Sequence, residues 1–294
     1  MTASAKVPVD VDGRQLVLSN LDKVLYPATG FTKGQVLDYY SRVAPVLLPH
    51  LADRPLTLKR YPDGVQGHSF YEKNAPSYRP DWLRVERLPS PGSTRKRETI
   101  DYAVLEDLAA LVWVANLACL ELHTPMWRVG RDGPDLLVFD LDPGPPADIV
   151  ACCEVALLLR DRLRTDGLDP LAKTSGSKGM QLYAAAGALG SSEQTSDYAK
   201  GLAQDLERRR PELVVHRMAK ALRPGKVLVD WSQNSAAKTT VTTYSLRARE
   251  RPTVSTPVTW AEVEACGHPA DLVFTTDDVL ARVEASGDLF APLL

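Results

Sequence analysis

Two aspartates separated by one residue stand at the end of an apolar run, within 138–144 (VFDLDPG). If this run is a strand, Asp140 and Asp142 point to the same face, because side chains alternate along a strand. Two close carboxylates repel each other and raise their own pKa values, so a cation between them is expected. Hard divalent ions such as Mg²⁺ and Mn²⁺ prefer oxygen ligands of this kind. The alternative is a strand-end Asp that caps the next helix, beside a solvated Asp.

A third carboxylate, Asp230, ends another strand-like run, 227–231 (VLVDW). Three strand-borne carboxylates are what a two-metal phosphoryl-transfer site requires, because they bridge two cations that align the attacking and leaving oxygens. The sequence does not show whether Asp230 lies near Asp140. A strand-terminal Asp at the start of a turn is the alternative interpretation.

The segment 173–179 (KTSGSKG) lies between these carboxylates and concentrates two glycines, three hydroxyl groups and two lysines. It lacks the spacing of a P-loop. Such a segment can still present backbone N–H groups, hydroxyls and an ammonium group to a phosphate chain. A flexible hairpin turn has the same composition, so both interpretations stay open.

Charge is distributed unevenly along the chain. The segment 207–251 holds eleven Lys and Arg against four Asp and Glu, although the whole chain has a formal net charge of −2. Acidic stretches at 132–169 and 262–288 offset this excess. Cations around Asp230 suit a polyanionic substrate, and we expect a local basic groove with salt-dependent binding. A solvated basic face unrelated to the aspartates is the alternative.

The elements that must position these residues alternate between strand-like and helix-like patterns, so we expect a mixed α+β fold. Strands are predicted at 14–18, 56–60, 69–73, 136–141, 178–186, 226–231 and 238–244. Capping boxes at Thr32/Gln35 and Ser191/Gln194 mark the beginnings of two helices. Further helices are predicted at 105–117, 147–164, 260–263 and 277–283. The segment 88–97 (LPSPGSTRKR) reads as a polar loop, and 130–134 is the best candidate for a domain boundary.

Composition excludes several classes of protein. With 294 residues, 44% apolar and 24% charged, the chain is neither disordered nor of low complexity. The four cysteines form no C-x-x-C pair, so free thiols in a reducing compartment are expected. The N-terminus has no apolar signal-peptide region, and no apolar run approaches the roughly 20 residues of a membrane helix. We therefore expect a soluble cytoplasmic protein.

Taken in order, the motifs D-L-D-P-G, T-S-G-S-K-G and V-D-W-S-Q-N resemble the polymerase domain of bacterial ligase D, within the archaeo-eukaryotic primase superfamily. The resemblance covers nearly the whole chain, and includes 22–30 (DKVLYPATG), 59–64 (KRYPDG), 121–125 (ELHTP) and 244–247 (YSLR). It implies one primase-polymerase domain over 1–294, with mixed and antiparallel sheets flanked by helices. A DNA-end-binding part is implied at about 1–130 and a catalytic core at about 131–294.

The resemblance also implies a function. This is a DNA-directed nucleotidyltransferase that adds nucleotides, preferably ribonucleotides, to primer 3′ ends at gaps and breaks in end-joining or gap-filling repair. It would use Mn²⁺ or Mg²⁺ in a two-metal mechanism, with nucleoside triphosphates as substrates. The implied partners are gapped or broken DNA with a 5′-phosphate, a Ku-like end binder and a DNA ligase. We expect a nucleoid-associated monomer that does not bind membranes.

Residue roles follow from the same resemblance. Asp140, Asp142 and Asp230 match the catalytic metal ligands. The residues matched to nucleotide binding are Lys59, His123, Ser175, Ser177, Lys178, Arg223, Gln233 and Arg247, with His123 near the sugar. Phe70 and Tyr71 match an aromatic pair that stacks on template bases, and Lys23 and Lys33 match a pair that grips a 5′-phosphate.

The chain departs from the family pattern at Gln181, where members usually carry His. Gln is neutral at every pH and can still donate a hydrogen bond. The fold should therefore hold, while phosphate binding or rate is in doubt.

Two other functions stay open. A haloacid-dehalogenase-type phosphatase also has D-x-D after an apolar strand, but Gly144 occupies the place of its Thr or Val. A non-catalytic module that only bridges DNA ends is the second. The chain carries no ligase or nuclease module, so it is a stand-alone relative, a split-operon partner of a ligase, or an excised domain.

Overall fold

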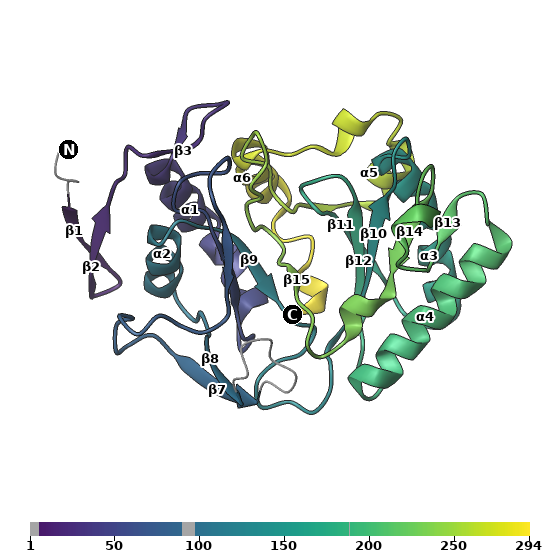
Figure 1. Ribbon diagram of the computed structural model, residues 1–294, viewed down its shortest axis with the longest axis horizontal. Coiled ribbons are helices and arrows are strands. Elements are labelled where there is room, and N and C mark those ends of the chain that lie inside the picture. The colour runs from purple at the N-terminus through teal and green to yellow at the C-terminus, as the bar shows by residue number, and fades with distance from the viewer. Residues whose placement is uncertain (1–5, 90–97, 188) are drawn as a thin grey trace.

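Two sheets carry the polar side chains described below (Figure 1). The computed structural model describes residues 6–89, 98–187 and 189–294. The larger sheet has the spatial order β13 (Val214–Val215), β14 (Val227–Asp230), β10 (Leu136–Pro143), β12 (Met180–Ala185), β11 (Leu171–Thr174) and β16 (Pro257–Val258). The smaller sheet has the order β15 (Thr240–Val241), β9 (Cys119–Thr124), β5 (Thr57–Arg60) and β6 (Phe70–Glu72). Neighbouring strands are antiparallel except for β13 and β14.

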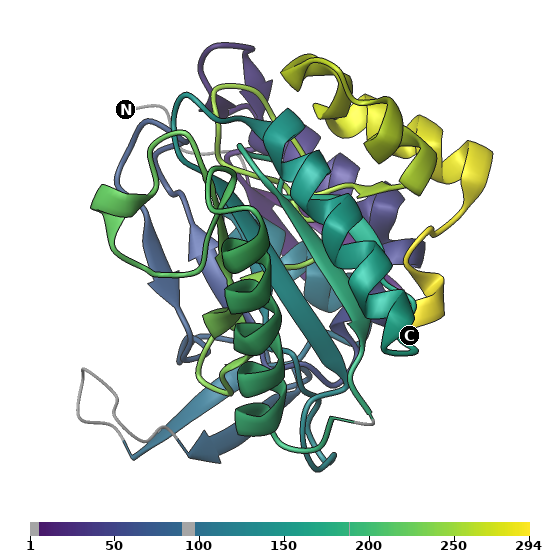
Figure 2. The same cartoon turned by 90° about the vertical axis from the view of Figure 1, so that its right-hand side faces the viewer.

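Two helices cover the outer face of the larger sheet, as Figure 2 shows. These are α3 (Ile149–Thr165) and α4 (Ser192–Arg209), and α4 begins at the predicted Ser191/Gln194 capping box. Leu137, Phe139 and Leu141 of β10 belong to the same buried cluster as both helices. Because side chains alternate along β10, its aspartates lie on the opposite face, toward the smaller sheet.

The other long helix, α1 (Lys33–Leu51), begins at the predicted Thr32/Gln35 capping box. Its predicted apolar stripe is buried, and consists of Val36, Tyr39, Tyr40, Val43 and Leu47. Together with α2 (Leu108–Asn116), it packs against the smaller sheet in a second cluster. The predicted start of α2 at Leu105 is wrong, because Asp107 caps the helix by accepting a hydrogen bond from Ala110 N.

Short elements complete the fold. Three two-stranded pairs are β1 (Lys6–Val11) with β2 (Arg14–Ser19), β3 (Val24–Tyr26) with β4 (Phe31–Thr32), and β7 (Val85–Pro89) with β8 (Thr99–Ala103). The C-terminal helices are α5 (Trp260–Ala265) and α6 (Thr276–Ser286). The predicted loop 88–97 is wrong at its start, because Leu88 and Pro89 pair with β8; residues 90–97 lie outside the described residues.

Two strand predictions need correction. Of 238–244, only Thr240 and Val241 form a strand, because Tyr244 N donates to Ser255 O, away from β9, and Tyr244 has a φ of 64°. Of 226–231, the strand ends at Asp230, and all four of its residues are buried on both faces. Propensity alone predicts neither outcome, since tertiary contacts decide both.

The chain after β15 joins the two halves of the molecule. Tyr244, Leu246, Val254 and Val279 belong to the cluster around α1 and α2, whereas Val258 and Val263 belong to the cluster around α3 and α4. The predicted boundary at 130–134 remains a prediction. Among the described residues, no helix has the length and apolar character needed to span a bilayer.

Candidate active site

Asp140 and Asp230 lie directly opposite each other on the paired strands β10 and β14. Asp142, two residues further along β10, shares their face. The sequence left the proximity of Asp230 open, and strand pairing supplies it. Burial raises the pKa of Asp140, and the charges of Asp142 and Asp230 raise it further. The pKa of Asp142 is raised by burial and by Asp230.

Hydrogen bonds hold two of these carboxylates. Asp140 Oδ1 accepts from Gln181 Nε2 at 3.0 Å. Asp230 Oδ1 accepts from Ser232 N and Ser232 Oγ at 2.9 and 2.6 Å, and its Oδ2 accepts from Gln233 Nε2 at 2.9 Å. The side-chain amide of Gln181 therefore donates, as predicted for this departure from the family pattern.

The chemistry of the three carboxylates fits a hard divalent cation, because oxygen donors that repel one another are stabilised by a positive charge between them. As the side chains lie, however, no group of three or more His, Cys, Asp or Glu in 6–89, 98–187 and 189–294 is arranged to hold a metal ion. Asp140 and Asp230 accept hydrogen bonds from Gln181 and Gln233 instead.

A cavity of about 480 Å³ opens between the two sheets in front of the aspartates. Its volume is within the range of small-molecule sites. It brings together most of the predicted site residues, which are His123, Asp140, Asp142, Ser175, Ser177, Lys178, Arg223, Gln233 and Arg247. Gln181, Arg249 and 239–241 also line it. Lys59 and Asp230 do not line the cavity. Asp230 accepts from Gln233, which does, whereas Lys59 pairs with Glu121, which in turn contacts His123 of the lining.

The segment 173–179 ends β11 and forms the turn to β12, because Lys173 and Thr174 belong to β11 and Thr174 pairs with Met180. The interpretation of this segment as a hairpin turn is therefore confirmed. Ser175 Oγ accepts from Ser177 N and Gly179 N at 3.2 and 3.3 Å. A Cβ on Gly179 would lie 2.0 Å from the carbonyl oxygen of Leu141, so only glycine fits there. The backbone N–H groups of Ser177 and Gly179 are therefore directed at Ser175, and binding of phosphate by this segment remains a prediction.

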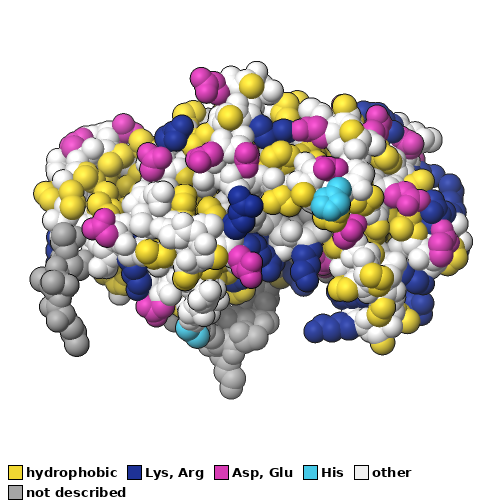
Figure 3. Space-filling model, turned by 90° about the horizontal axis from the view of Figure 1, so that it is seen from above, with side chains coloured by type: hydrophobic (Ala, Val, Ile, Leu, Met, Phe, Trp, Pro, Cys, Tyr) yellow, Lys and Arg dark blue, Asp and Glu magenta, His cyan; other side chains and the backbone are white. Residues whose placement is uncertain are grey.

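One buried guanidinium nitrogen of the cavity lining has no hydrogen-bond partner. In the part of the chain that the structure describes, Arg223 Nε is buried and unsatisfied. Arg247 Nε also lacks a hydrogen bond, but it forms an ion pair with Glu121 Oε1 at 3.4 Å. An unpaired buried N–H group is costly, so Arg223 Nε calls for an acceptor such as a phosphate oxygen or water. In Figure 3, Lys and Arg side chains gather near the middle of the face shown.

The predicted basic groove is only part of the charged segment. Arg223, Arg247 and Arg249 line the cavity. The three consecutive arginines at the end of α4 do not line the cavity. They form ion pairs with Asp205, Glu154 and Glu212 instead. These three residues are Arg208, Arg209 and Arg210. The excess charge of 207–251 therefore divides between the cavity and a solvated face.

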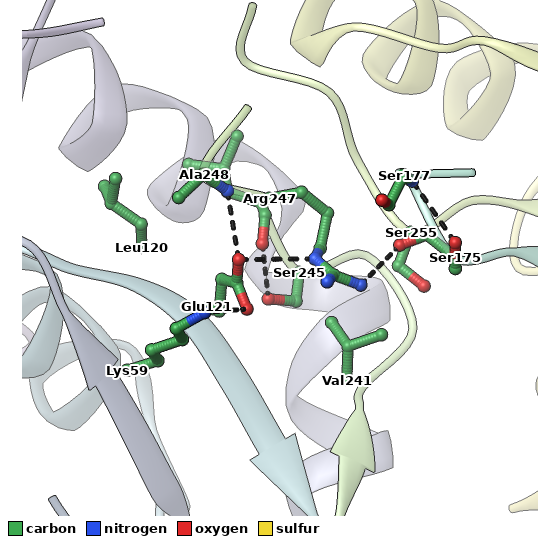
Figure 4. A network of polar contacts seen from close by, with 12 residues as sticks. Lys59, Leu120, Glu121, Ser175, Ser177, Val241, Ser245, Arg247, Ala248 and Ser255 are labelled. Carbon is green, nitrogen blue, oxygen red and sulfur yellow. Dashed lines mark hydrogen bonds and ion pairs between the residues drawn. The ribbon is translucent and has the colours of Figure 1, made fainter. Parts of the chain in front are cut away.

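Sequence reasoning missed Glu121. This residue is 2% exposed and lies among Lys59, His123 and Arg247. Figure 4 shows it between Lys59 and Arg247. A signal was present in the sequence: Glu121 and His123 are polar side chains on one face of an otherwise apolar strand, β9.

The residues predicted to bind DNA lie on the half of the molecule built around α1. Lys23 is exposed and forms an ion pair with Asp63 at 3.0 Å. Lys33 is 4% exposed and donates to the carbonyl oxygen of Ser19 at 2.6 Å. Burial lowers the pKa of Lys33 to about 8, and the charges of Lys23 and Arg60 contribute.

The predicted aromatic pair lies on β6. Tyr71 is 56% exposed, with its ring 5.7 Å from that of His123, so it borders the cavity. Lys59 Nζ lies 5.2 Å from the centre of the Tyr71 ring. Phe70 is half-buried beneath the Arg60 guanidinium at 5.3 Å.

Comparison with known proteins gives the family. The family described as "LigD, primase-polymerase domain" matches residues 32–290. The chain is 45% identical over 279 residues to the multifunctional non-homologous end joining protein LigD of Mycolicibacterium smegmatis, covering 94% of this chain and 36% of that protein. It is 31% identical over 274 residues to the bifunctional LigD of Bacillus subtilis, covering 93% of this chain and 43% of the relative. The chain thus spans less than half the length of these relatives.

A solved structure shows the same fold. The polymerase domain from Mycobacterium tuberculosis ligase D, in complex with DNA, is similar with a TM-score of 0.88 and 43% identity. The similarity covers 95% of this chain and 97% of that one. The predicted mixed α+β fold is confirmed, and the phosphatase interpretation is wrong. The chain belongs to the LigD primase-polymerase domain family of polymerase-type nucleotidyltransferases.

Proposed function

We propose that this chain adds nucleotides, preferably ribonucleotides, to primer 3′ ends at DNA gaps and breaks during end joining. The observation that carries the proposal is the cavity between the sheets, where Asp140 and Asp142 face Lys178, Arg223 and Arg247. Acidic and basic walls in one cavity suit a substrate that brings both a metal-bound hydroxyl and a triphosphate.

Asp140, Asp142 and Asp230 would hold Mn²⁺ or Mg²⁺, which when bound lowers the pKa of a primer hydroxyl and stabilises charge on the triphosphate. Lys178 and Arg247 would bind the phosphates, and the unsatisfied Nε of Arg223 would donate to a phosphate oxygen. Ser175, Ser177 and Gln233 would orient the same group from the loop and from the turn after β14. His123 would contact the nucleotide sugar, and Lys59 would add positive charge from behind the cavity lining.

The other predicted residues would bind DNA. Lys23 and Lys33 lie together at the start of α1, where Lys33 N donates to the carbonyl oxygen of Lys23 at 2.8 Å. Two ammonium groups in this position suit a 5′-phosphate at the far side of a gap. Tyr71 and Phe70 would stack on template bases, an interaction that tolerates any base.

Three further parts of the proposal concern context. We infer that residues up to about 130 form the DNA-end-binding part and that 131–294 form the catalytic core. The partners would be a Ku-like end binder and a DNA ligase, because the relatives are named as end-joining proteins. The protein would act as a nucleoid-associated monomer in the cytoplasm.

The decisive experiment is primer extension on a 5′-phosphorylated gapped duplex. Reactions would compare ribonucleotides with deoxyribonucleotides, in Mn²⁺, in Mg²⁺ and in EDTA. Metal-dependent extension with faster use of ribonucleotides is expected. If the protein binds the gapped duplex but extends no primer with either metal, it is a non-catalytic end-binding module instead.

A further inference from the structure

Glu121 is a buried carboxylate placed among a lysine, an arginine and a histidine. Its Oε2 lies 3.0 Å from His123 Nε2, its neighbour on β9, and 3.8 Å from Lys59 Nζ on β5. Its Oε1 lies 3.4 Å from Arg247 Nε, in the turn after β15. Figure 4 shows the carboxylate between Lys59 and Arg247. One acidic group therefore connects three of the residues proposed to bind nucleotide.

Neutral donors complete the surroundings of this carboxylate. Ala248 N donates to Oε1 at 3.1 Å, and Tyr61 OH donates to the same oxygen at 3.4 Å. The contact with Arg247 continues to the loop, because Arg247 Nη1 donates to the carbonyl oxygen of Ser175 at 2.7 Å. Glu121 thus reaches the 173–179 loop through a single side chain.

The protonation states follow from this arrangement. Burial alone would raise the pKa of Glu121, but the hydrogen bond from His123 and the charges of Arg247 and Lys59 outweigh it and lower the pKa. Burial lowers the pKa of His123, although Glu121 opposes this effect. A neutral imidazole has one N–H, and an ionised carboxylate can only accept. The proton of His123 is therefore on Nε2, and Nδ1 is left as a hydrogen-bond acceptor.

We propose that Glu121 is a positioning residue of the nucleotide site: it holds Lys59 and Arg247 together and fixes His123 with Nδ1 as an acceptor for a hydroxyl group of the bound ligand. The inference rests on the proposed function, because it concerns the same cavity. Without the Glu121 carboxylate, the positive charges of Lys59 and Arg247 would lose their common partner. The two side chains would then repel each other and separate. The ligand class is a polyanion that also carries a hydroxyl donor, as a nucleoside triphosphate does.

Two simpler roles make opposite predictions. If Glu121 only offsets positive charge, then Glu121→Gln leaves a more positive cavity and a polyanion binds more tightly. If Glu121 only stabilises the fold, then the substitution lowers the melting temperature without a selective effect on any ligand. Only a positioning role predicts weaker binding of nucleotide with unchanged binding of the DNA end.

The test measures equilibrium binding in the full chain, by titration calorimetry with ATP and Mg²⁺ and by anisotropy with a 5′-phosphorylated gapped duplex. For Glu121→Gln, we expect at least tenfold weaker binding of ATP and a change of less than twofold for the duplex. The ATP KM in primer extension should rise by a similar factor, with kcat changed less. Unchanged or tighter binding of ATP would overturn the proposal.

Two further variants control for folding. Asp135→Asn removes a partly buried carboxylate, which pairs with Arg54 at 2.6 Å and does not line the cavity; it should lower the melting temperature and leave ATP affinity unchanged. Glu121→Asp keeps the charge and should bind ATP at least threefold more tightly than Glu121→Gln. If Glu121→Gln does not fold, Glu121→Asp decides: threefold to tenfold weaker ATP binding than wild type supports the proposal, and equal binding refutes it.

The same measurements separate this inference from the proposed function. A wild-type protein that binds ATP but extends no primer refutes nucleotide addition, and the comparison of ATP affinities still tests Glu121. A protein that extends primers, with equal ATP affinity in wild type and both Glu121 variants, refutes the inference alone.

Discussion

Asp140 and Asp230 are direct cross-strand partners, although the 173–179 loop and two helices lie between them in the sequence. Opposed carboxylates on neighbouring strands destabilise a sheet unless a cation or hydrogen-bond donors compensate. Donors are present on both residues, and the pKa of Asp140 is nonetheless raised by burial and by its acidic neighbours. The close approach of these carboxylates therefore destabilises the sheet at the place where the proposed chemistry occurs.

This destabilisation predicts that a substitution of Asp140 has opposite effects on stability and on activity. Asp140→Asn removes one charge and keeps an oxygen that can accept from Gln181. In metal-free buffer at pH 7.5, its free energy of unfolding should increase by about 1 kcal/mol, because a raised pKa means that the ionised form is disfavoured in the fold. Primer extension should fall at least about 100-fold. Denaturant unfolding and single-turnover extension measure the two effects.

Asp230→Asn is the matched comparison, since Asp230 already accepts from Ser232 and Gln233. It should lose extension to a similar degree and gain no stability. Both variants should still bind gapped DNA. Undiminished extension by either would exclude the three-aspartate mechanism.

The lowered pKa of Lys33, about 8, predicts that binding of a 5′-phosphate depends on pH. A phosphate dianion stabilises the ammonium form and raises this pKa in the complex. Affinity for a 5′-phosphorylated gap should therefore be constant from pH 6.5 to 7.5 and fall above pH 8, by up to about tenfold per pH unit. Anisotropy titrations at fixed ionic strength measure the effect.

An unphosphorylated gap serves as the control, and its affinity should lack this decline above pH 8. Lys33→Met should remove most of the difference between the two duplexes. A pH dependence shared by both duplexes would mean that Lys33 contacts the DNA backbone generally.

Tyr71 is exposed beside the cavity, so its ring is available to stack on a base. Tyr71→Ala should weaken binding of a single-stranded template overhang by about 1–3 kcal/mol, whereas Tyr71→Phe should retain affinity because the aromatic face is kept. Tyr78, which is 63% exposed and contacts Arg60, is a matched control. An equal loss for Tyr78→Ala would show a general surface effect rather than stacking.

Gly179 predicts a local effect on stability. Its missing Cβ leaves room for the carbonyl oxygen of Leu141, so Gly179→Ala should lower the free energy of unfolding by about 2 kcal/mol or more and displace the 173–179 loop. Gly187→Ala, at a position with nothing within 4 Å, should change stability by about 0.5 kcal/mol or less. Equal melting temperatures for the two variants would contradict this packing.

Local signals predicted local structure well. The capping boxes at Thr32 and Ser191 fixed the beginnings of two helices, because a cap involves only residues three positions apart. The pairing of β10 with β14, and hence the meeting of Asp140 and Asp230, depends on contacts between distant segments and had no local signal. The alternation of Glu121 and His123 along β9 was visible in the sequence, but the approach of Lys59 on β5 and of Arg247 after β15 depends on contacts between distant segments.

The packing of residues after β15 against the half of the molecule built around α1 and α2 has a consequence for synthesis on the ribosome. Tyr244, Leu246, Val254 and Val279 complete the apolar cluster that α1 and α2 begin. The N-terminal portion cannot close its interior while it emerges, because it must wait for residues 244–279. Nascent chains should therefore expose apolar surface until these residues leave the ribosome, which makes chaperone binding and slow, length-dependent acquisition of protease resistance the expected behaviour.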